Sequence, residues 1–121
     1  MSLKSLMSYT FVSKYARWCP EKKRRETWGE SVDRVRNMMI DKYGDTPEVS
    51  KAIDQAYDDM KRKKILGSQR ALQFGGSPIF KHNARIYNCI ASYIDRVRFF
   101  QECMYLLLCG CGTGFSVQTH H

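Results

Sequence analysis

The clearest pattern of hydrophobic and polar positions in this chain begins at Thr27 and continues to about Tyr43. Apolar residues recur there at helical spacing and share one face, whereas the charged residues between them fall largely elsewhere. The apolar positions are Val32, Val35, Met38 and Met39. The opening "TWGE" has the form of a capping box, in which Thr27 and Glu30 each accept a backbone N–H. The pattern predicts a core-facing helix over this range.

A second helix is predicted directly after the first. The segment "YGDTPEV" offers Gly44 as a helix stop, Thr46 as an N-cap and Pro47 at the first helical position. The predicted helix runs to about Lys64, and its basic end, "KRKK", suits the negative end of the helix dipole.

The segments on either side of these helices have weaker patterns. Residues 1–26 show no sustained period and end in the basic tract "PEKKRRE", so we expect an arm with one short helical turn at most. Residues 65–94 lose the helical period and contain several glycines and a proline. We expect loops there, with two short extended segments near Ala71–Phe74 and Tyr87–Tyr93.

A third helix is predicted near the end of the chain. Asp95 is placed as its N-cap, and Gly110 as its stop. An apolar stripe is expected from Val97, Phe100, Met104, Leu107 and Leu108. The following "GCGTGFSVQ" is typical of a glycine turn that leads into a strand.

The order of extended segment, helix, glycine turn and strand is typical of a β-α-β crossover. Such a unit needs neighbouring parallel strands, and this chain offers too few of them. We therefore expect an α/β fold that is mainly helical, and three parts: a basic arm at 1–26, a helical region at 27–64 and the start of a larger α/β structure at 65–121.

Length and charge limit the possible functions. The chain has 121 residues, enough for one domain, and its 20 Lys and Arg against 12 Asp and Glu give a net charge of +8. That charge favours polyanionic partners such as nucleic acid, nucleotides or an acidic protein surface. The five cysteines lack the spacing of a secreted disulfide scaffold, which favours a reducing, cytoplasmic setting. We expect neither a signal peptide nor a membrane span.

Four motifs in register resemble one enzyme family. They are "YARWCPEKKRRETWGESVDRV", "GSQRALQFGG", "YNC" and "CGCGTGFSV". Their order and separations are similar to the N-terminal part of ribonucleotide reductase catalytic subunits, most of all the adenosylcobalamin-dependent class II enzymes of the monomeric, triphosphate-reducing type. The resemblance covers about residues 14–121. It implies helices that precede the first strands of a ten-stranded α/β barrel.

The resemblance implies a radical mechanism with thiols as reductants. In this family a cysteine thiyl radical removes the 3′ hydrogen of the ribose, water leaves from C2′, and a cysteine pair supplies two electrons and becomes a disulfide. Cys89 matches the first cysteine of that pair. The partner cysteine, the radical cysteine and the cobalamin-contacting segments of the family have no counterpart in this chain. Adenosylcobalamin is the implied cofactor, and a thioredoxin-like protein the implied reductant of the complete enzyme.

The same resemblance implies substrate contacts. Ser68 matches a position near the substrate phosphates, although Gly67 replaces the usual proline. Asn88 belongs to the "YNC" motif, and Gly112 with neighbouring Cys111 matches a backbone stretch that passes close beneath the nucleoside, where a missing side chain permits close approach. Cys111 is not expected to be catalytic.

Simpler interpretations stay open for several residues. Cys89 and Cys103 could be packing thiols, and Cys109 with Cys111 could form a metal or redox pair, although their spacing is not C-x-x-C. The closing residues His120 and His121 could belong to a tag or a metal site, but "FSVQTHH" reads as continuing family sequence. We predict no metal site.

Two functions from different classes follow. The first is the N-terminal part of a ribonucleotide reductase, inactive alone, acting on a ribonucleotide with a second polypeptide that completes the barrel. It could be a truncated product, an interrupted gene or half of a split enzyme. The second is a small basic module that binds nucleic acid or an acidic protein. Nucleic acid is the less expected partner, since "KKRR" and "KRKK" lack interleaved aromatic residues.

Overall fold

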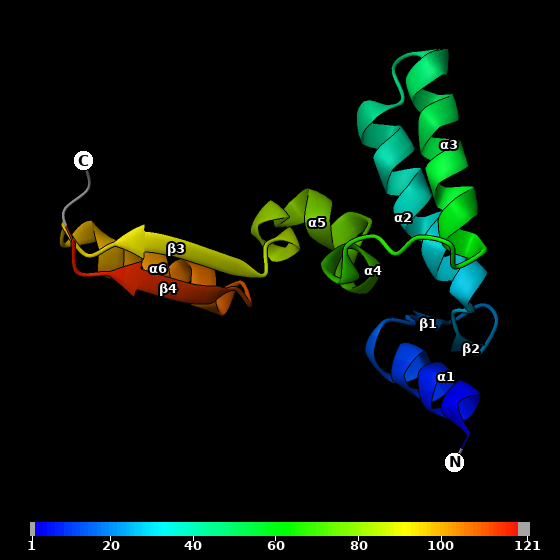
Figure 1. Cartoon of the computed structure of the whole chain (residues 1–121), viewed down its shortest axis with the longest axis horizontal. Coiled ribbons are helices and arrows are strands. Elements are labelled where there is room, and N and C mark those ends of the chain that lie inside the picture. The colour runs from blue at the N-terminus through cyan, green and yellow to red at the C-terminus, as the bar shows by residue number, and fades with distance from the viewer. Residues whose placement is uncertain (1, 119–121) are drawn as a thin grey trace. The chain divides into compact units, whose positions relative to one another are not determined.

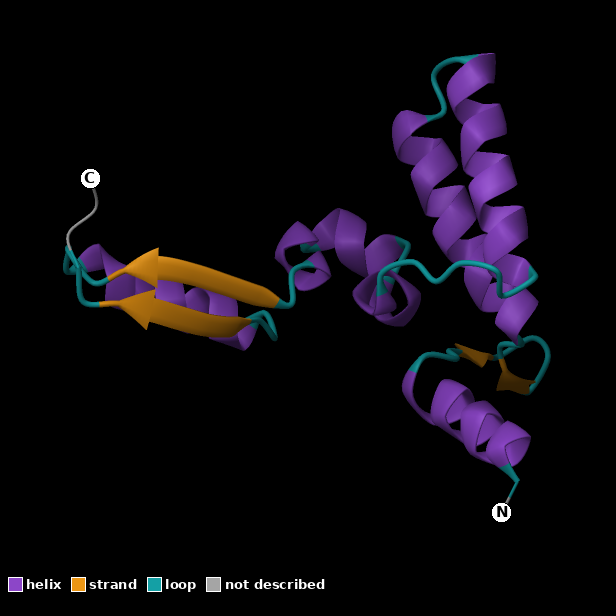
Figure 2. Ribbon diagram, viewed as in Figure 1, coloured by secondary structure: helices purple, strands orange, loops and turns teal. Residues whose placement is uncertain are grey.

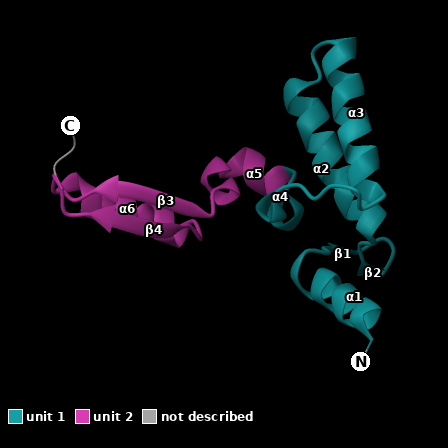
Figure 3. Ribbon diagram, in the orientation of Figure 1, with its two compact units in different colours: residues 1–76 teal, residues 77–121 magenta. Residues whose placement is uncertain are grey.

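A computed structural model describes residues 2–118 of the chain, so the histidines at 120 and 121 lie outside the described residues. The chain is a mixed α/β protein, mainly helical, with two short sheets. It divides into two compact units, residues 1–76 and residues 77–121 (Figure 3). The predicted part boundaries after residues 26 and 64 stay predictions.

The first unit opens with a helix where an arm was predicted, so that prediction was wrong. Helix α1 spans Leu3–Lys14 and is capped by the hydroxyl of Ser2, which accepts the N–H of Ser5. None of its residues is buried, and this explains why no apolar period reveals it. Within it, Phe11 packs edge-on against Trp28, with ring centroids 5.5 Å apart.

A two-stranded hairpin and two long helices follow α1. Strands β1 (Trp18–Cys19) and β2 (Arg24–Arg25) pair antiparallel. Helix α2 (Trp28–Tyr43) carries the predicted capping box, and helix α3 (Pro47–Lys61) the predicted Thr46 cap and first-turn proline, so both helices are confirmed. Helix α3 ends slightly earlier than predicted. The two helices lie side by side (Figure 1).

Helix α4 (Gln69–Phe74) completes the core of this unit. The extended segment predicted near Ala71–Phe74 is therefore wrong. The hydroxyl of Ser68 accepts the N–H of Ala71 and starts a helical turn, and the side chain of Leu72 is then buried. The buried apolar residues of the unit are Ala16, Val32, Val35, Met38, Met60, Ala71 and Leu72.

The second unit contains the predicted crossover. Helix α5 (Ser77–Lys81) and the 3-10 helix η1 (Asn83–Ile86) precede strand β3 (Cys89–Tyr93), helix α6 (Arg98–Leu108) and strand β4 (Gly112–Ser116). The two strands pair in parallel, with α6 connecting them, as Figure 2 shows. The β-α-β prediction is confirmed for one pair of strands. A larger barrel stays a prediction.

Helix α6 differs from its prediction in two ways. Asp95 does not cap it: the N-cap residue is Val97, with no side-chain cap bond, and Asp95 instead accepts a hydrogen bond from Arg96. The predicted apolar stripe also does not face the sheet. The stripe residues are exposed: Val97, Phe100, Met104, Leu107 and Leu108. Helix α6 instead turns Phe99, Cys103 and Leu106, which recur at helical spacing, towards the strands, so the predicted stripe lies on another part of the helix surface.

The end of α6 is as predicted. Gly110 follows the helix with φ of 89°, a left-handed conformation that glycine adopts at little cost and that turns the chain towards β4. Within residues 2–118, none of the helices combines the length and the apolar character that crossing a membrane requires.

Candidate functional site

The two faces of the β3–β4 sheet differ in their surroundings. Helix α6 packs on one face, where Phe99 contacts Phe115 with ring centroids 6.0 Å apart. The side chains of Cys89 and Ala91 alternate with those of Ile90 and Ser92 and so belong to the opposite face. We call this opposite side the open face. Cys89 is exposed on it.

The strand register brings the predicted redox cysteine and the predicted nucleoside-facing glycine together. Cys89 and Gly112 are direct partners in the parallel pairing, and Ala91 is the partner of Gly114. The N–H of Gly112 donates to the carbonyl of Asn88 at 2.7 Å, which fixes this end of the sheet. Cys89, Asn88 and Gly112 are therefore neighbours at the start of both strands.

Packing does not require glycine at positions 112 and 114 of β4. A Cβ atom on Gly112 would lie 3.5 Å from the carbonyl oxygen of Asn88, and one on Gly114 would lie 3.9 Å from that of Ile90. Both distances are ordinary van der Waals contacts. The fold would accept side chains at both positions, and their absence leaves the backbone of the open face accessible next to Cys89.

Cys111 is the predicted site residue whose side chain points away from the open face. Its side chain is buried, and its Sγ lies 3.4 Å from the carbonyl oxygens of both Ala84 and Tyr87. The thiol therefore ties η1 to the beginning of β4. Only its backbone could serve a substrate, and the expectation that Cys111 is not catalytic stays a prediction.

Ser68 belongs to the first compact unit, whereas the other predicted site residues belong to the second. Its hydroxyl caps α4 by accepting the N–H of Ala71 at 3.3 Å. This bond accounts for the serine by local structure alone. A phosphate contact at Ser68 stays a prediction.

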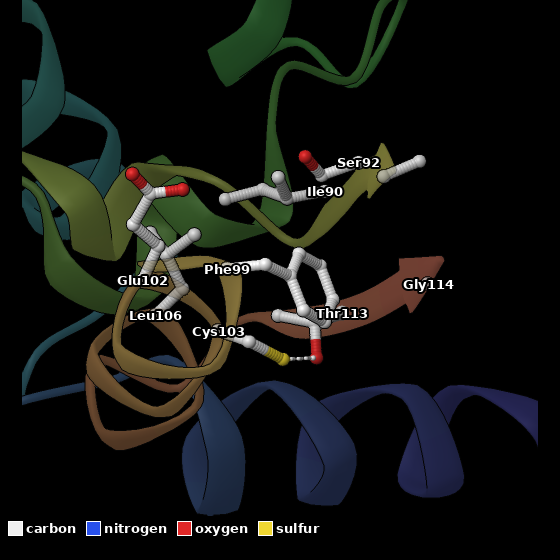
Figure 4. A pocket seen from close by; sticks show the side chains of 9 residues that line it. Ile90, Ser92, Phe99, Glu102, Cys103, Leu106, Thr113 and Gly114 are labelled. Carbon is white, nitrogen blue, oxygen red and sulfur yellow. Dashed lines mark hydrogen bonds between the residues drawn. The ribbon is translucent and has the colours of Figure 1, made fainter. Parts of the chain in front are cut away.

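A pocket lies on the other side of the sheet, between α6 and both strands. Its volume is about 210 Å³, and Figure 4 shows the side chains that line it. Cys103 of α6 and Thr113 of β4 meet there, with the Sγ and Oγ1 atoms 2.9 Å apart. The carboxylate of Glu102 accepts a hydrogen bond from Arg96 at 2.6 Å, so it is engaged at the rim. Apolar groups dominate the rest.

Sequence reasoning missed this pocket. Cys103 follows Phe99 by four residues, and this spacing could have placed both on one face of α6, although it does not show which face meets the sheet. The pocket is separate from the open face, because Cys103 and Cys89 lie on opposite sides of the sheet. Among residues 2–118, the structure contains no group of three or more His, Cys, Asp and Glu side chains able to hold a metal ion.

Comparisons of this chain with protein-family models, with curated proteins and with solved structures find no match in any of the three.

Proposed function

We propose that this chain supplies the first strands of a ribonucleotide reductase barrel and one of its two reducing cysteines, Cys89. The observation that carries the proposal is the parallel register of β3 and β4, in which Cys89 is the partner of Gly112. The two positions that the family resemblance assigns to redox chemistry and to the nucleoside backbone stretch are thus adjacent on one exposed face.

The architecture supports the same proposal. In a closed α/β barrel the helices lie outside and the opposite faces of the strands line the interior. On β3 and β4 that interior would be the open face. Cys89, Ala91, Gly112 and Gly114 present little bulk at the start of that face, and Tyr93 lies at its other end. A ribonucleotide could approach the backbone there, with the thiol of Cys89 beside it.

The proposed chemistry needs a second polypeptide. Cys89 and a cysteine of that partner would give two electrons and protons to the ribose, whose 2′-hydroxyl leaves as water, and the two thiols would become a disulfide. A thioredoxin-like protein would then reduce this disulfide. Adenosylcobalamin stays an expectation from the resemblance; no described residue is assigned to it, and no step proposed for this chain passes through it.

The test is reconstitution with matched cysteine variants. The chain is used as bait in a lysate of the cells that express it, and the co-purifying material is assayed for ribonucleotide reduction with and without adenosylcobalamin. We expect activity that is lost with Cys89→Ser and retained with Cys103→Ser, since Cys103 lies on the other face of the same sheet. Activity that survives Cys89→Ser, or a partner without any reductase activity, would exclude the proposed role.

A further inference from the structure

Two basic runs that are far apart in the sequence meet at the first turn of α2. The hairpin run is formed by residues 22–25 and the helix-end run by residues 61–64. From the hairpin run, Lys22 and Arg24 both form salt bridges with Glu30. Because Glu30 is the third residue of α2, the hairpin run lies against the beginning of that helix.

The helix-end run reaches the same place. The ammonium of Lys61 pairs with Asp33 at 2.6 Å, one helical turn beyond Glu30. The ammonium of Lys63 lies 5.8 Å from the centre of the Trp28 ring, and the Trp28 indole N–H donates to the carbonyl of Lys61 at 3.1 Å. We call residues 22–25 and 61–64 together the basic surface.

The basic surface keeps positive charge after its internal pairing. Half of its cations form no salt bridge within residues 2–118: Lys23, Arg25, Arg62 and Lys63. All four are exposed. Cations that are exposed and close together attract a polyanion, and phosphate groups release condensed counterions when such cations neutralise them.

Each basic run contains one lysine with an unfavourable backbone conformation, which indicates that its side chain has a function. Lys23 and Lys63 have φ values of 49° and 60°, and within residues 2–118 they are the non-glycine residues with positive φ. A left-handed conformation is costly for a lysine and nearly free for glycine. Strained positions of this kind cluster at functional sites. Both basic turns thus carry a lysine ammonium where glycine would serve the fold better.

An exposed aromatic side chain lies beside this charge. Trp18 has 59 % of its surface exposed, and it is the direct partner of Arg25 in the hairpin. Directly opposed residues of an antiparallel pair share a face, so the side chains of Trp18 and Arg25 leave the hairpin on the same side. The guanidinium of Arg25 donates one hydrogen bond there, to the carbonyl of Ala16 at 2.8 Å. Unpaired bases stack on such planar groups. The proximity of Trp18 to the basic runs could not be predicted from the sequence, because neither run contains an aromatic residue.

We propose that the basic surface, with Trp18, binds single-stranded nucleic acid. The exposed cations hold the phosphates, and Trp18 with Arg25 stacks on an unpaired base. A duplex offers phosphates but no free base faces, and an acidic protein surface offers neither a phosphate spacing nor a base. The combination of exposed cations with an exposed indole favours the single strand over both.

The test is fluorescence anisotropy of labelled oligodeoxythymidine, long enough for a site of about 4–16 nucleotides, titrated with the full chain at several salt concentrations. Replacing Lys23 and Lys63 together by glycine keeps both left-handed turns and removes two charges. We expect this double variant to bind more weakly and to lower the slope of log K against log salt by about 1.4. Trp18→Ala should weaken binding at least about fivefold without changing that slope.

The matched control removes two charges elsewhere. Lys42 and Lys51 are exposed and lie at the other end of the α2–α3 pair, so Lys42→Ala with Lys51→Ala should leave the affinity within about twofold. An equal loss in this control would overturn the proposal, since binding would then follow net charge alone. Equally tight binding of a duplex, of polyglutamate or of phosphatidylserine vesicles would also overturn it. Circular dichroism verifies that every variant is folded.

Discussion

At the scale of single residues, one buried ion pair organises the first unit. Arg34 and Glu26 are 14 % and 9 % exposed, and their side chains meet in two hydrogen bonds of 2.8 and 2.9 Å. Burial alone would raise the pKa of Glu26, but hydrogen bonds from Arg34, the backbone N–H of Arg17 and the hydroxyl of Ser31 together lower it. The stabilisation from this lowered pKa is therefore present above the usual value of 4.5 and is lost as the pH falls below it.

The same guanidinium also binds α4. Its Nη1 donates to the carbonyl of Gly75 at 3.1 Å and its Nη2 to that of Leu72 at 2.8 Å. A planar fork with five N–H donors can serve all these acceptors at once, whereas an ammonium cannot. Arg34 thus joins Glu26, at the start of α2, to the end of α4.

We predict that Arg34→Lys lowers the free energy of unfolding by about 2–3 kcal/mol, because buried acceptors lose their donors while the charge is kept. Urea denaturation followed by circular dichroism measures this change. Arg36→Lys is the matched control, since Arg36 pairs with Asp54 at the surface, where such a change costs less than about 1 kcal/mol. Equal losses of unfolding free energy in the two variants would show that the contacts of Arg34 stabilise the protein no more than a surface ion pair does.

At the scale of elements, the sequence predicts those helices whose first residues include a capping side chain. The caps at Thr27 and Thr46 act within one turn, so local sequence suffices to place α2 and α3. Helix α1 buries no residue and α4 has only six, so neither offers an apolar period to detect. The face that α6 buries depends on the sheet beneath it, and the sequence of α6 does not contain that information.

The candidate site, too, was predictable from the sequence only in part. The motifs around Cys89 and Gly112 were predictable one by one, and a parallel crossover was predictable from the order of elements. Their direct pairing depends on the strand register, which tertiary contacts decide. The buried position of the Cys111 thiol depends on the carbonyls of Ala84, in η1, and of Tyr87, directly after it, more than 20 residues earlier in the chain.

A prediction for α6 follows from its observed orientation. Phe99 is 4 % exposed and contacts the ring of Phe115, whereas Phe100 is 61 % exposed. Phe99→Ala should destabilise the second unit by about 3 kcal/mol or more, and Phe100→Ala by less than about 1 kcal/mol. Hydrogen exchange of the β3 and β4 amides measures both changes. If Phe100→Ala speeds exchange as much as Phe99→Ala, the apolar stripe predicted from the sequence is the buried face after all.

At the scale of the whole molecule, the two compact units differ in how completely they bury their apolar residues. The first unit has a core that draws on α2, α3 and α4, and its buried ion pair lies entirely within it. The second unit leaves the apolar stripe of α6 exposed, and as far as residue 118 its sheet has two strands. Two strands with one helix are at the lower limit of independent stability. The first unit is therefore the part we expect to fold by itself.

We predict that a fragment of residues 1–76 unfolds cooperatively in urea, whereas a fragment of residues 1–64 is less stable by at least about 3 kcal/mol, or unfolded. The shorter fragment keeps both long helices but loses Leu72 from the core and two of the carbonyls that Arg34 binds. It also loses the N–H of Gly76, which donates to the Sδ of Met38 at 3.1 Å. Equal stability of the two fragments would mean that residues 65–76 do not belong to this core, and that the boundary at residue 64 indicated by the hydrophobic pattern is the real one.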